Sequence, residues 1–169
     1  AQEPFMRGVA KAKSERGFDE MTMKLNPLTE SFPVTDENGA PLSMDEITSG
    51  FMSAANEIEA SVSYLGDIQG DPYVGEQTRL ALDSQKFAAL AEVQKRAAGA
   101  NVEWVQNALG HRVTMRLQEG IKGTTGEEGV AAMRQTLSEI LKDARNDNTP
   151  NATNIVVGAG LAYIEKMLS

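Results

Sequence analysis

The sequence predicts an all-α protein, a bundle of five or six helices preceded by an extended N-terminal arm. Ala, Leu, Met, Gln and Glu dominate its longer periodic stretches, and these residues favour helix. Aromatic residues, which are enriched in strands, make up only 5% of the chain. Hydrophobic residues make up 41% of 169 residues, enough to build the core of one domain. We therefore expect an arm over residues 1–42 and a helical bundle domain over residues 43–169.

The arm is expected to contain one short helix, over residues 4–16, with Pro4 at its first position. Three prolines interrupt the stretch that follows, residues 17–41: Pro27, Pro33 and Pro41. Apolar residues alternate there with polar ones, which is the period of an extended chain: Met21, Met23 and Leu25. The run "DENG", residues 36–39, predicts a turn.

Periodicity changes at Ser43, which forms a capping box with Glu46 and starts a helix predicted over residues 44–65. Its apolar residues keep three-four spacing: Ile47, Phe51, Ala54, Ile58, Val62 and Leu65. Asp71 and Pro72 predict the start of the next helix. Its predicted stripe consists of Leu80, Phe87, Leu90 and Ala97, and a break is expected at "AAGAN" around Gly99.

Three further helices complete the predicted bundle. The first carries two neighbouring stripes and is expected to bury a broad face: Val102, Val105, Leu109, Val113 and Leu117, with Trp104, Ala108, His111 and Met115 beside them. A second capping box, Thr125 and Glu128, starts a helix that ends near Asn146. The last begins at Thr149-Pro150 and aligns four apolar residues: Val157, Leu161, Ile164 and Leu168.

Composition and charge exclude several classes of function. The chain has no cysteine and a single histidine, which excludes disulfides, thiolate sites and any mechanism that needs two imidazoles. Net charge is -8, and residues 31–70 hold seven acids without a Lys or Arg, so nucleic acid is not expected as a partner. The longest apolar stretch, Ile155 to Ala162, is far short of a membrane span. We expect a soluble protein without a cofactor, cytoplasmic or exported.

The stretch "GDIQGDPYVGEQ", residues 66–77, gathers three acids that could suggest a cation site: Asp67, Asp71 and Glu76. Counted from Asp67, an EF-hand loop would need glycine at position 6 and glutamate at position 12, where Pro72 and Thr78 stand. The stretch is better interpreted as the corner between two helices. His111 shares a predicted stripe with Trp104, so we expect a packed histidine rather than a base or a metal ligand.

Glu30 is the one candidate for a catalytic acid. Its position before a serine in "TESF" resembles the acid of a lytic transglycosylase, but the motifs that should follow it are missing. A small helical hydrolase of the muramidase type, dependent on carboxylates, is therefore kept only as the alternative function.

Two groups of residues predict contacts with a protein partner or a second copy. The arm is too apolar for a solvated tail, so it should dock either on the chain's own bundle or on a neighbour. Small residues in the last helix would let another helix approach, within the subunit or between subunits. The candidate partner-binding residues are Phe18, Met21, Met23, Leu25, Phe32, Gly158, Gly160 and Ala162. We expect a non-enzymatic helical subunit of a larger assembly, such as a virion or a secretion apparatus, that acts through protein–protein contacts.

Overall fold

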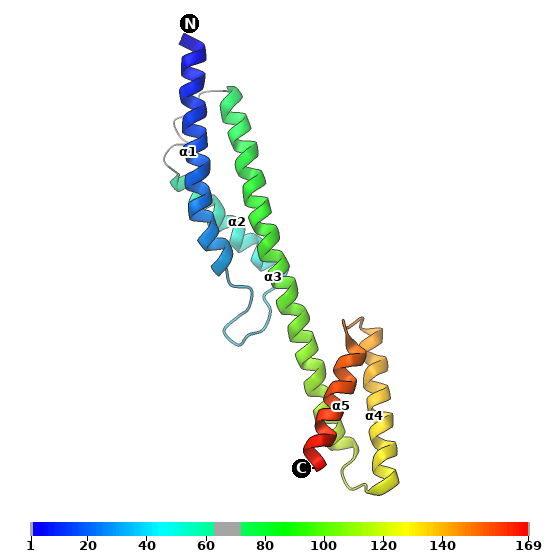
Figure 1. The fold of residues 1–169 in the computed structure, drawn as a ribbon. Coiled ribbons are helices and arrows are strands. Elements are labelled where there is room, and N and C mark those ends of the chain that lie inside the picture. The colour runs from blue at the N-terminus through cyan, green and yellow to red at the C-terminus, as the bar shows by residue number, and fades with distance from the viewer. Residues whose placement is uncertain (1, 63–71, 169) are drawn as a thin grey trace. The chain divides into compact units, whose positions relative to one another are not determined.

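The computed structural model describes residues 2–62 and 72–168 and is all-helical over these ranges. They form five helices: α1 (Gln2–Ser31), α2 (Met44–Ser61), α3 (Pro72–Gly120), α4 (Gly126–Asn146) and α5 (Ala152–Leu168) (Figure 1). The extended pairing found in these ranges is a single antiparallel bridge between Thr35 and Pro41. The predicted fold class, an all-α protein of five or six helices, is confirmed. No helix in the described ranges combines the length and apolarity that crossing a membrane requires.

The chain divides into two compact units, Ala1–Gly99 and Ala100–Ser169. The division falls within α3, whereas the sequence placed the domain boundary between residues 42 and 43. Each unit has a hydrophobic core of its own, and α3 contributes residues to both. The predicted arm lies in the first unit, which we call unit 1; the second is unit 2.

The N-terminal segment differs from its prediction, because helix α1 does not end near residue 16 but continues to Ser31. Two of its residues, Met21 and Leu25, are four positions apart and are buried in the core of unit 1, while Met23 between them is 77% exposed. The alternation that indicated an extended chain is therefore one buried face of a helix with an exposed methionine on the other side. Pro27 stands within the helix, and its own carbonyl accepts a hydrogen bond from the Ser31 hydroxyl at 2.7 Å.

Residues 32–43 connect α1 to α2 and contain the turn expected at "DENG". One Asp36 carboxylate oxygen accepts hydrogen bonds from the backbone amides of Asn38 and Ala40, both at 2.9 Å. Gly39 adopts a φ of 81°, which glycine tolerates far better than other residues. The Ser43 hydroxyl then accepts from the Glu46 amide at 3.1 Å, which confirms the predicted N-cap of α2.

Unit 1 packs α1, α2 and the first half of α3 around one core. Two side-chain contacts link α1 to α3 in the same direction along both helices: Ser14 with Thr78 at 2.5 Å, and Thr22 with Gln85. These two helices therefore lie side by side and parallel (Figure 1). The contacts of α2 with α3 run in opposite order, so α2 is antiparallel: Glu59 with Lys86, and Thr48 with Gln94.

The core of unit 1 draws apolar residues from all three helices. Its buried members are Met21, Leu25, Ile47, Phe51, Ala55, Val62, Leu82, Leu90, Val93 and Ala97. Phe51 is fully buried, and its ring and that of the half-buried Phe32 meet in a T-shaped contact, with the centroids 5.5 Å apart and the planes at 86°. This edge-to-face contact fixes the point where the chain leaves α1.

Arg96 of α3 ties down the end of α1. Its guanidinium donates to the carbonyl oxygens of Thr29 at 2.9 Å and Glu30 at 3.2 Å, and also to that of Phe32. The last carbonyls of a helix have no partner within the helix, and a guanidinium at this end also complements the negative end of the helix dipole.

Unit 2 packs the second half of α3 against α4 and α5. Its buried core consists of Leu109, Val113, Leu117, Ile140, Ala144, Ala152 and Val156. The predicted break of α3 at "AAGAN" is wrong, because the helix continues through Gly99 for a total of 49 residues. A glycine in a helix costs about 1 kcal/mol relative to alanine, which did not suffice to end α3 here. The second capping box is also wrong, because the Thr125 side chain makes no capping bond where Gly126 turns the chain with a φ of 59°.

Candidate partner-binding surfaces

The arm residues predicted to bind a partner separate into two groups. Met21 and Leu25 are buried in the core of unit 1, and Phe32 is half-buried against Phe51. Phe18 and Met23 are exposed on α1. The sequence left two interpretations open for the arm, docking on the chain itself or on a neighbour. Met21 and Leu25 dock on the chain itself. Phe18 and Met23 stay predicted contact residues.

The small residues of α5 also separate, and only one of them is used inside the unit. A Cβ added to Gly160 would lie 3.2 Å from Leu137 Cδ2 and 3.3 Å from Cδ1, so this glycine lets α4 and α5 approach closely. A Cβ added to Gly158 would meet no atom within 4 Å. Ala162 is exposed as well. The close contact within unit 2 therefore accounts for Gly160 and leaves Gly158 and Ala162 on the surface.

The stripe predicted for α5 is wrong, because Val157 is half-exposed and Leu161 is 56% exposed. Among the residues of α5 whose burial is described, 152–167, the buried ones are Ala152, Val156 and Gly160. The run Ile155 to Ile164 holds no charged residue, so both sides of the helix could have been buried and periodicity could not choose between them. The fit of Leu137 against Gly160 decided which side packs.

We call the surface formed by Val157, Gly158, Leu161 and Ala162 the outer face of α5. All four residues are exposed, and none carries a polar side chain. Val157 and Leu161 were missed as surface residues by the sequence reasoning. The signal that could have found them is the uncharged run itself, since a helix with one solvated side ordinarily carries charges there.

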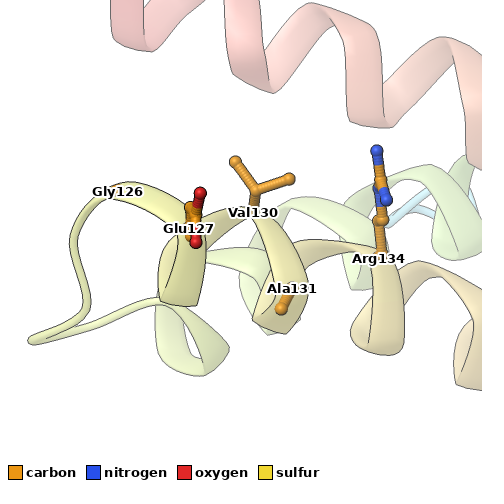
Figure 2. Close-up of a pocket in the computed structure, with 5 residues that line it drawn as sticks. All are labelled: Gly126, Glu127, Val130, Ala131 and Arg134. Atoms are coloured by element: carbon orange, nitrogen blue, oxygen red, sulfur yellow. The ribbon is translucent and has the colours of Figure 1, made fainter.

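The neighbouring helix α4 has a shallow recess near its start. Five exposed residues line it: Gly126, Glu127, Val130, Ala131 and Arg134. Figure 2 shows Glu127, Val130 and Arg134 on one side of α4, pointing towards the helix coloured as α5, with Ala131 turned away. The recess is lined by two apolar side chains, Val130 and Ala131, and by the opposite charges of Glu127 and Arg134. It is too open to hold and desolvate a small substrate.

Helix α3 also exposes apolar side chains that were predicted to be buried. In unit 1, Leu80 and Phe87 lie on the exposed side, while Leu90 and Ala97 of the same predicted stripe are buried. Ten residues separate Leu80 from Leu90, which rotates them about 80° apart on a helix of 3.6 residues per turn. The predicted stripe therefore spans two different faces of α3.

In unit 2, the predicted second stripe of α3 is exposed along its whole length: Trp104, Ala108, His111 and Met115. The expectation that this helix buries a broad face, with a packed His111, is wrong. Leu109, Val113 and Leu117 alone face the core, since two short helices cover only one side of α3.

The described residues hold no group of three His, Asp or Glu side chains placed to bind a metal ion. Asp67 and Asp71 of the acidic loop lie outside the described ranges. Glu76, the third acid, is exposed on α3, and Glu30 is exposed in the last turn of α1. A catalytic glutamate needs a partly buried setting, and an exposed helix end does not provide one.

Among the described residues, Lys86 of α3 is the one charged residue that is buried. Its ammonium lies 2.6 Å from Glu59 Oε2, 3.3 Å from Asp83 Oδ1 and 3.0 Å from Asn56 Oδ1. Burial lowers the pKa of Lys86, but the hydrogen bonds and charges of Glu59 and Asp83 outweigh burial and raise it above its ordinary value. The amine thus stays protonated at neutral pH, so it holds α2 against α3 and is not available as a nucleophile.

No family model, no curated protein and no solved structure matches this chain. Its function must therefore be argued from its surfaces.

Proposed function

We propose that the protein is a non-enzymatic helical subunit of a larger assembly, and that it binds an apolar helix of a partner protein on the outer face of α5. The main evidence for this proposal is that the outer face of α5 is exposed and uncharged. Leu161 is 56% exposed, and Val157 beside it is half-exposed. An exposed apolar patch of this kind is typical of an interaction site.

The composition of the outer face fits a helix better than a flat partner. Gly158 and Ala162 are four residues apart, so they lie on one side of the helix one turn from each other. Open space above Gly158 lets a partner backbone come close, and Val157 and Leu161 provide the apolar ridge beside it. The rim is polar, with Glu165 exposed one turn beyond Leu161. An apolar centre with a polar rim is the usual anatomy of a protein interface.

A carboxylate-dependent hydrolase of the muramidase type finds no supporting geometry in the described residues. Glu30 is exposed, and its backbone carbonyl accepts a hydrogen bond from Arg96 at the end of α1. We expect the purified chain not to clear peptidoglycan, and clearing that is lost in Glu30→Gln would overturn the proposal.

The proposal is tested by placing a charge in the outer face. Leu161→Glu buries a carboxylate in any complex formed there, and Leu80→Glu is its matched control, because Leu80 is 57% exposed on α3 in unit 1. A partner recovered with the tagged full-length chain would be purified and titrated against wild type and both variants. Light scattering over a range of concentrations would report a second copy as the partner.

We expect Leu161→Glu to weaken binding at least tenfold and Leu80→Glu to leave it unchanged, since an unpaired charge buried at an interface costs several kcal/mol. Equal loss in both variants, or binding retained in Leu161→Glu, would refute the assignment to α5. A wild-type chain that binds no purified partner and stays monomeric at all concentrations would refute the proposed function itself.

A further inference from the structure

One stretch of α3 lies between the two cores without contributing a buried residue to either. Ala97 is the last residue that α3 buries in unit 1, and Leu109 is the first that it buries in unit 2. Residues 98–108 between them are exposed or half-buried, which amounts to about three helical turns. From Thr78 to Ala97 and from Leu109 to Leu117, α3 buries a residue every three or four positions. Within residues 98–108 the Gln106 side chain donates a hydrogen bond to the Pro150 carbonyl at 3.1 Å, and the stretch otherwise depends on the intrinsic stability of the helix.

The intrinsic stability of this stretch is low. Its sequence, "AGANVEWVQNA", contains three alanines, but also one glycine, two asparagines, two valines and a tryptophan, which favour helix less than Leu, Lys, Gln or Glu do. Glu103 is its only charged residue, so the stretch contains no pair of opposite charges to support it. Gly99 is not needed for packing, because a Cβ added to it would meet nothing within 4 Å.

We propose that α3 opens locally within residues 98–108 while the cores of both units stay folded, so that this stretch is a hinge-like break point in the helix. Opening the middle of a helix creates two new helix ends, which the nucleation parameter of about 10⁻³ makes unfavourable by roughly a thousandfold. Weak helix formers make opening easier, so the preference for the closed helix is smaller still. The opening uncouples the stabilities of the two units, since a change in one core is not transmitted through an open helix. This inference does not depend on the proposed function.

Amide hydrogen exchange on the full chain tests the break point, because each helical amide in 102–108 bonds to a carbonyl in 98–104. We expect these amides to be protected about a thousandfold or less and to exchange by local opening, insensitive to low denaturant. Amides near Val93 and Val113, beside buried residues, should be protected more strongly and respond to denaturant.

Two glycine variants sharpen the test. Gly99→Ala should slow exchange at 102–108 by about fourfold to fivefold, the ratio by which alanine favours helix over glycine. Gly110→Ala is the matched control, because an added Cβ there also meets nothing within 4 Å, but buried Leu109 and Val113 flank it. It should leave exchange at 102–108 unchanged. Exchange of 102–108 only together with the cores, or equal slowing by both variants, would overturn the inference.

Discussion

The ion cluster around Lys86 predicts that two substitutions in one contact change the free energy of unfolding by very different amounts. The Lys86 side chain is buried, whereas its partners reach water: the Glu59 side chain is 27% exposed and that of Asp83 is 43% exposed. Removing the lysine therefore leaves two carboxylates that water can solvate. Removing the Glu59 carboxylate leaves an ammonium that water reaches poorly.

The magnitudes follow from this asymmetry. Glu59→Ala deletes the 2.6 Å charged hydrogen bond, and we expect a loss of about 2–3 kcal/mol, less than for a fully buried pair because Asp83 and Asn56 still contact the ammonium. Lys86→Met keeps the length of the side chain and removes the charge. We expect it to change the free energy of unfolding by less than about 1 kcal/mol, since the Glu59 and Asp83 carboxylates left behind reach water and are not buried, uncompensated charges.

Urea unfolding followed by far-ultraviolet circular dichroism measures both variants and their combination. In the Lys86→Met background, Glu59→Ala should lose most of its effect, because no buried charge remains to be compensated. Equal losses for the two single variants, or full additivity in the double variant, would refute the reasoning.

The same cluster has a defined pH dependence. The folded-state pKa of Lys86 lies above its unfolded-state value, so protonation contributes fully to stability below the unfolded pKa. The contribution is lost as pH rises through the folded pKa. Wild type should therefore lose stability in the alkaline range relative to Lys86→Met, with no difference in slope near neutral pH.

Three further predictions follow from packing. Phe51→Ala removes a fully buried ring and should cost about 3–5 kcal/mol in urea unfolding, and a cost below 1 kcal/mol would contradict the core assignment. Arg96→Ala should increase amide exchange in the last turn of α1, and Arg96→Lys should restore protection only in part, because an ammonium lacks the planar fork that reaches several carbonyls. Gly158→Ala should raise stability by about 0.5–1 kcal/mol, while Gly160→Ala should not, because its Cβ would press on Leu137; equal gains would show that Leu137 yields freely.

The surfaces of this protein were harder to predict than its helices. The sequence led to the residues of the arm and of α5, but it could not tell which would be buried. Met21 and Leu25 are used in the core of unit 1, while Met23 beside them is exposed. Candidate contact residues could be recognised only as apolar, and apolar residues serve cores and interfaces alike.

Local chemistry by itself determined the helical class, the N-cap at Ser43, the start of α3 at Pro72 and the turn at "DENG". These features depend on dihedral preferences and hydrogen bonds between residues close in sequence, so the residues present are enough to specify them. Tertiary structure alone decided that Leu161 faces outward, that α3 has two cores along its length, and that α1 continues to Ser31. A helix with more than one apolar side can bury any of these sides. Only the fit of side chains distant in sequence, such as Leu137 against Gly160, selects the side that is buried.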